Sequence, residues 1–184
     1  MKINIPDEIQ QLALETYLVI RHQIADDRVV TVLHIADEYS FIAQGLLPDK
    51  PDHLWVFDIG TVRTAHDYFT HNPPTPGEVE NAIQVVEDEV MPLHKLLIPK
   101  SNLYTLDGNI SEIARLAAFK EYTPGMILAR TDLELLFSRL AAIITGRPAS
   151  QDVLPTTNSF ASTLLILREV MHHLAFLDIT VLSH

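Results

Sequence analysis

The chain has 184 residues, of which 47% are hydrophobic and 20% charged, and it contains no cysteine. That length is enough for one domain with its own core, so we expect a single globular domain over residues 1–184. Within it we expect an N-terminal helix in residues 1–27 and the core in residues 28–184. The lack of cysteine excludes disulfides, thiolate metal sites and thiol catalysis, which suits a cytoplasmic protein.

The formal net charge is −11, and the basic residues are scattered along the chain. Such a charge repels polyanions, so we expect no nucleic acid as a partner. No apolar run approaches the ~20 residues that cross a bilayer, and the first seven residues do not resemble a signal peptide. We therefore also expect no membrane association.

A first helix opens at Pro6, has acidic residues in its first turn, and is predicted to end near Ile24. Three apolar and β-branched segments follow, and each predicts a strand. These strands cover residues 28–36, 40–47 and 53–61. Because their connections are short, we expect an antiparallel meander.

Helices and strands alternate in the rest of the chain. Thr75 and Glu78 form a capping-box pattern that begins a helix running to about Leu97, with a possible kink at Pro92. Thr131 and Glu134 repeat the pattern at a later helix. The other predicted elements are a strand at 102–107, helices at 110–119, 131–144 and 159–176, and a last strand at 179–183.

These elements predict an α/β fold with a five-stranded mixed sheet and helices on both faces. The expected spatial order is third, second, first, fourth and fifth strand, with the last two parallel to the first. The loops at 36–39 and 107–109 are then predicted to lie together at the carboxyl ends of their strands, where open α/β sheets place ligands.

Several segments in this order resemble one protein family. They are residues 29–41 (VVTVLHIADEYSF), 57–64 (FDIGTVRT), 74–80 (PTPGEVE), 103–116 (LYTLDGNISEIARL) and 164–183. Together they resemble the second, C-terminal lobe of the exopolyphosphatase / guanosine pentaphosphate phosphohydrolase (Ppx/GppA) family. That resemblance implies a ribonuclease H-like lobe of the actin-like, sugar-kinase superfamily.

The phosphate motifs of that family are altered here. Where the family has DIGGGSTE, this chain has HIADEYSF, so His34 and Phe41 replace the two acids. Ala36, Asp37 and Glu38 replace the three glycines. The family's second loop, GTGGT, becomes TLDGN and keeps only Gly108. The resemblance therefore implies lost magnesium ligands and a non-catalytic protein without a cofactor; Mg²⁺ is implied only if the chain is active.

Other residues leave alternatives open. Asp58, in the sequence FDIGT, is a magnesium-site acid if this segment is the first phosphate loop; otherwise it is an acid near the surface at a strand end. Asp107, Gly108 and Asn109 form either a ligand pocket at a helix N-terminus or a turn in which Gly108 has a positive φ and Asn109 caps the helix.

Two further features are expected to be structural. His172 and His173 are adjacent on a helix, so they point in different directions and form no i, i+4 ligand pair; we expect one of them on the solvent side. The acidic run from Glu87 to Glu89 is typical of a solvated helix face.

Three functions remain. The leading hypothesis is a non-catalytic relative of the Ppx/GppA second lobe that acts through protein contacts. The family's first lobe has no counterpart in this sequence, so we expect an apolar face covered by a homodimer or by a family-related partner. The second is a phosphohydrolase acting on polyphosphate or a guanosine polyphosphate, with Asp37, Glu38 or Asp58 as the acids. The third is a sensor of small anions or nucleotides that uses the Gly108 loop.

Overall fold

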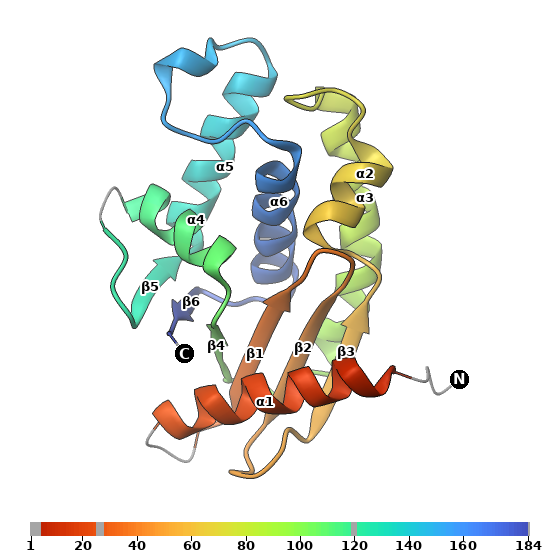
Figure 1. The fold of residues 1–184 in the computed structure, drawn as a ribbon, viewed down its shortest axis with the longest axis vertical. Coiled ribbons are helices and arrows are strands. Elements are labelled where there is room, and N and C mark those ends of the chain that lie inside the picture. The colour runs from red at the N-terminus through yellow and green to blue at the C-terminus, as the bar shows by residue number, and fades with distance from the viewer. Residues whose placement is uncertain (1–4, 25–27, 119–120, 184) are drawn as a thin grey trace.

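A six-stranded mixed sheet forms the centre of the computed structural model, which describes residues 5–24, 28–118 and 121–183. The strands lie in the order β3-β2-β1-β4-β6-β5 (Figure 1). Their bounds are β1 Val30–Ile35, β2 Ser40–Gly45, β3 His53–Phe57, β4 Asn102–Thr105, β5 Met126–Ala129 and β6 Asp178–Val181.

The predicted meander is confirmed. β1 pairs antiparallel with β2, and β2 pairs antiparallel with β3, with Ile42 opposite both Leu33 and Trp55. All six residues of β2 are buried because strands flank it on both sides and the sheet is covered on both faces. β3 lies at the end of the sheet, so one of its edges carries no described strand.

On the other side of β1, the parallel pairings are also confirmed. β1 pairs with β4, and β4 pairs with β6, each in parallel. The predicted number of five strands is wrong, because β5 adds an antiparallel edge strand beside β6. Four residues, with Ile127 exposed and Leu128 buried, are too few for a clear alternating pattern.

Helices cover both faces of the sheet, as expected, but unequally. The helices are α1 Asp7–Gln23, α2 Thr61–Tyr68, α3 Pro76–Val90, α4 Gly108–Ala118, α5 Arg130–Ile144 and α6 Asn158–His173. On one face, Ala13, Tyr17 and Ile20 of α1 pack on Val32 and Phe41. On the other face, a larger core joins the sheet to α3, α4, α5 and α6. α1 accordingly crosses the sheet alone in Figure 1.

Several predicted boundaries change. The third strand ends at Phe57 instead of residue 61, and α2 forms in a segment for which no helix was predicted. The capping box of Thr75 and Glu78 is confirmed at α3. The helix after it ends at Val90, and a 3₁₀ turn, η1 Met91–Lys95, takes in Pro92, because proline cannot donate the next helical hydrogen bond.

The ends of the later helices also differ from prediction. Thr131 does not cap α5, which begins one residue earlier with Ala129 at the N-cap and no side-chain cap. α4 begins at Gly108, and its predicted end, Phe119, lies outside the described residues. Among the described residues, no helix combines the length and apolar composition needed to cross a membrane.

Candidate functional site

The loops at residues 36–39 and 107–109 lie together, as predicted. Asp107 lies two residues after the end of β4 and bonds to the end of β1 through both carboxylate oxygens. Nδ1 of His34 lies 2.6 Å from Oδ1, and the backbone N–H of Ile35 donates to Oδ2 at 2.7 Å. Because a carboxylate only accepts, the His34 Nδ1 carries the proton of this hydrogen bond. The Asp107 side chain is only 8% exposed, and both of its oxygens bond to groups of the protein.

The turn between β1 and β2 binds the N-terminus of α2. The backbone N–H of Thr61 donates to the carbonyl of Ala36 at 2.9 Å, and those of Val62 and Arg63 donate to the carbonyl of Asp37 at 3.0 Å each. The Asp37 carboxylate accepts a further bond from the Thr61 hydroxyl at 2.9 Å. These are the N–H groups that a helix N-terminus offers to a phosphate. Here the protein's own turn occupies them.

Gly60 makes this contact possible. A Cβ atom at Gly60 would lie 2.6 Å from the backbone nitrogen of Tyr39 and closer still to the carbonyl oxygen of Asp37. The backbone of Gly60 is extended, so its role is to allow the close approach of two chain segments. The glycine of the FDIGT sequence therefore serves internal packing.

The other candidate acids, and the residue that replaces an acid of the family's motif, lie in different environments. Phe41 is fully buried in the core beneath α1, with its ring centroid 4.9 Å from that of His34. Glu38 is exposed at the turn. Asp58 follows β3 with its side chain 79% exposed, and Arg63 donates to it at 3.1 Å. Asp37 thus bonds to α2 and Asp107 bonds to β1, whereas Glu38 and Asp58 lie on the surface.

The Gly108 loop differs from the predicted turn. Gly108 is the first residue of α4 and is not among the residues with positive φ, and Asn109 lies within the helix instead of capping it. Asn109 lines a small pocket of about 170 Å³ together with Glu112 and residues at the start of α6. That volume is below the 300–1,000 Å³ typical of sites for organic ligands, and Glu112 adds a negative charge to it.

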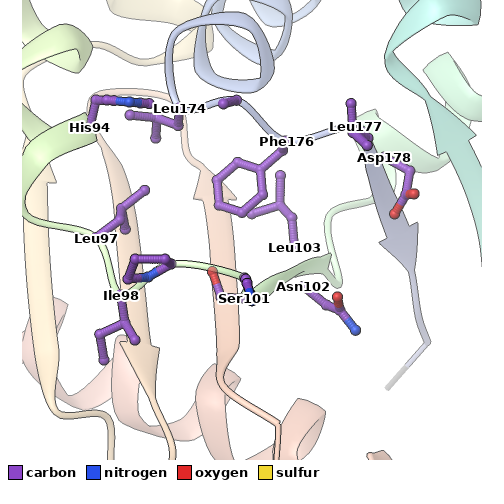
Figure 2. Close-up of a pocket in the computed structure, with 13 residues that line it drawn as sticks. His94, Leu97, Ile98, Ser101, Asn102, Leu103, Leu174, Phe176, Leu177 and Asp178 are labelled. Atoms are coloured by element: carbon purple, nitrogen blue, oxygen red, sulfur yellow. The ribbon is translucent and has the colours of Figure 1, made fainter.

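A larger cavity, of about 540 Å³, lies at the opposite end of the parallel strands, where β4 begins (Figure 2). Phe176, Leu103 and Leu97 form its apolar wall, and His94 and Asp178 stand at its rim. The cavity lies at the amino end of β4, whereas Asp107 follows the carboxyl end of that strand. It shares no residue with the loops described above.

Sequence reasoning missed one cluster of polar residues. His173 lies beside Glu87 and Glu169, between α3 and α6. The spacing of Glu169 and His173 by four residues on one helix was the available signal, but comparing His173 only with His172 overlooks it. The expectation that one of these histidines is solvated is correct, since the side chain of His172 is 54% exposed.

Solved structures share this fold. A Ppx/GppA phosphatase from Aquifex aeolicus matches with a TM-score of 0.78 and 18% identity, over 95% of this chain and 59% of that protein. An exopolyphosphatase from Cytophaga hutchinsonii matches with a TM-score of 0.71 and 14% identity, over 95% of this chain and 60% of that protein. No protein-family model and no curated protein sequence matches the chain.

The predicted resemblance to the Ppx/GppA proteins is therefore confirmed at the level of the fold. This chain spans less than two thirds of the length of each of these two structures, as expected for a match to one lobe.

Proposed function

We propose that this chain is a non-catalytic relative of the Ppx/GppA second lobe and acts through protein contacts. One observation carries the proposal: the polar groups at the phosphate-loop positions, and the helix N-terminus beside them, bond within the protein. The Asp107 carboxylate is hydrogen-bonded to His34 and Ile35. The first N–H groups of α2 donate to backbone carbonyls of the turn at Asp37.

Charge at the same place supports the proposal. Asp37 and Glu38 are exposed on the turn where the family has glycines. A carboxylate about 4 Å from a phosphate charge costs roughly 4 kcal/mol at an effective dielectric near 20. A polyphosphate chain would meet this repulsion beside the α2 N-terminus, whose first N–H groups already bond to the protein's own turn.

We expect the purified chain to release no phosphate from polyphosphate or from guanosine pentaphosphate in the presence of Mg²⁺. The measurement is inorganic phosphate over time, with a complete Ppx/GppA phosphatase assayed in parallel. Turnover that disappears in Asp37→Asn or Asp58→Asn, but persists in the matched surface variant Asp49→Asn, would establish the rival hypothesis of an active phosphohydrolase.

The outer edge of β3, which pairs with no described strand, supports a protein contact. An apolar groove of about 370 Å³ runs along this strand, lined by Trp55, Phe57, Leu93 and Leu96 among others. Glu89 is the only charged residue among the described residues of its lining. Leu96 is 59% exposed. An edge strand beside an apolar groove is suited to accept another strand.

We assign this groove to a second copy of the chain. Antiparallel pairing of β3 with its own copy is self-complementary, as a twofold dimer requires, and would join the two sheets into one. The two copies also repel each other, because each carries a net charge of −11. Salt screens this repulsion, so the dimer is expected to tighten as ionic strength rises.

We expect the protein to be a dimer in light scattering, and Leu96→Glu to shift it to monomer by placing a charge in the groove. The matched control is Leu135→Glu, whose leucine is 66% exposed on α5, outside the groove; that variant should stay dimeric. Trp55 is the chain's single tryptophan, so its fluorescence reports on the groove directly. A monodisperse wild-type monomer across a roughly tenfold range of concentration would rule the dimer out.

A further inference from the structure

Three potential metal ligands converge between α3 and α6. Nε2 of His173 lies 3.1 Å from Oε1 of Glu87 and 3.2 Å from Oε2 of Glu169. One atom from each of the three side chains lies within 4.8 Å of the others. The cluster is separate from the loops at Asp37 and Asp107, so the inference does not depend on the proposed function.

Two helices hold these side chains in place. Glu169 and His173 are one turn apart on α6, so they project from the same face. Glu87 comes from α3, which packs along α6. Glu169 is 1% exposed, whereas His173 and Glu87 are 18% and 29% exposed. The cluster therefore has a buried inner ligand and an outer side that an ion and water can reach.

A hydrogen bond from a neutral His173 does not explain why two carboxylates lie beside its Nε2. A neutral imidazole has at most one proton on Nε2, yet two carboxylate oxygens approach that atom. The two carboxylates also lie close to each other, which is unfavourable unless a positive charge stands between them.

Arg168 orients the inner ligand. Its Nη1 donates to Oε1 of Glu169, and its Nε donates to Glu134 at 2.7 Å. Oε2 of Glu169 is thereby left to face His173, as second-shell donors commonly arrange in metal sites. Burial raises the pKa of the Glu169 carboxyl, and Arg168 opposes that rise.

The charges favour a dication. Glu87, Glu134 and Glu169 with the single guanidinium of Arg168 leave two negative charges when His173 is neutral. A divalent ion would neutralise them, and the chain's net charge of −11 attracts cations at longer range.

We propose that Glu87, Glu169 and His173 bind a divalent transition-metal ion of the zinc class, which fastens α3 to α6. An imidazole nitrogen favours zinc and its neighbours in the first transition row over Mg²⁺ or Ca²⁺, which prefer oxygen ligands alone. Three protein ligands leave one position of a tetrahedral ion to water.

The test titrates Zn²⁺ and Co²⁺ into the tag-free, chelator-treated full chain. We expect one tight site per chain by calorimetry, a higher melting temperature with Zn²⁺, and visible Co²⁺ absorption bands typical of low coordination number. His173→Gln and Glu87→Gln should each weaken binding by more than the about 10–100-fold that loss of a second-shell partner costs. Glu87 is the more exposed, so its variant tests the site even if His173→Gln does not fold.

The matched control is His172→Gln, which removes the neighbouring, 54% exposed imidazole and should bind like the wild type. The competing account is a protonated His173 shared by two carboxylates. It predicts no stoichiometric metal binding, with variants that lose stability alone. That result, or tight binding that survives both Glu87→Gln and His173→Gln, would overturn the proposal.

Discussion

Gly60→Ala is expected to destabilise the protein by about 3–5 kcal/mol, a large share of the stability of an ordinary domain. The added Cβ would lie 2.6 Å from the Tyr39 backbone nitrogen and closer to the Asp37 carbonyl. Both neighbours are backbone, so neither can rotate away. The β1–β2 turn would have to leave α2, and three backbone hydrogen bonds would be lost with it.

Urea denaturation of the wild type and of two alanine variants measures this effect. Gly108→Ala is the control, because a Cβ at Gly108 meets nothing within 4 Å and its residue begins a helix. That change should be neutral or stabilising by up to about 1 kcal/mol. Equal midpoints for the two variants would show that the turn does not depend on close approach at Gly60.

Asp107→Ala is expected to cost about 2–4 kcal/mol. It removes two hydrogen bonds to a charged acceptor and leaves the N–H of Ile35, a buried residue, without its partner. The Asp107 hydrogen bonds also hold the end of β1 to the segment after β4, beyond the last paired residues of the two strands, Val32 and Tyr104. Asp58→Ala removes an exposed acid after β3 and should change stability by no more than about 0.5 kcal/mol.

The same variant separates two roles for Asp107. If Asp107 were a ligand of an anion or nucleotide sensor, Asp107→Ala would melt like the wild type. It would instead alter the shift in melting temperature that phosphate or a nucleotide produces. An unchanged melting temperature without ligand would therefore contradict the structural role assigned here.

The sequence predicted the sheet best where its pattern is local. Short turns after β1 and β2 permit only antiparallel neighbours, and long helical connections permit the parallel pairs β1–β4 and β4–β6. β5 was missed because its four residues become a strand through pairing with β6, in which Met126 lies opposite Val181. Nothing near Met126 in the sequence carries that information.

α2 was missed for a similar reason. Thr61–Tyr68 has no acid in its first turn and no side-chain cap. Its first N–H groups are satisfied by carbonyls of Ala36 and Asp37, which belong to a turn well before it in the chain. The residues of α2 therefore lack the local signals of a helix start, and the helix is stabilised by its contact with the β1–β2 turn.

The candidate site could be predicted in position but not in its bonding. Parallel strands place the ends of β1 and β4 at one edge, so the proximity of the two loops follows from topology. The use of Asp107 does not follow, because its partners His34 and Ile35 are distant in sequence. Glu87 and His173 are also distant in sequence, and the packing of α3 on α6 brings them together.

The place of β6 in the sheet constrains the order in which the chain can fold. β6 follows the other strands in sequence, yet it lies between β4 and β5 and pairs with both. During synthesis, the β1–β3 meander can form from neighbouring segments, whereas β5 has no strand partner until β6 has left the ribosome. The edge of the sheet at β5 can therefore be completed only after β6, the last strand, has been made.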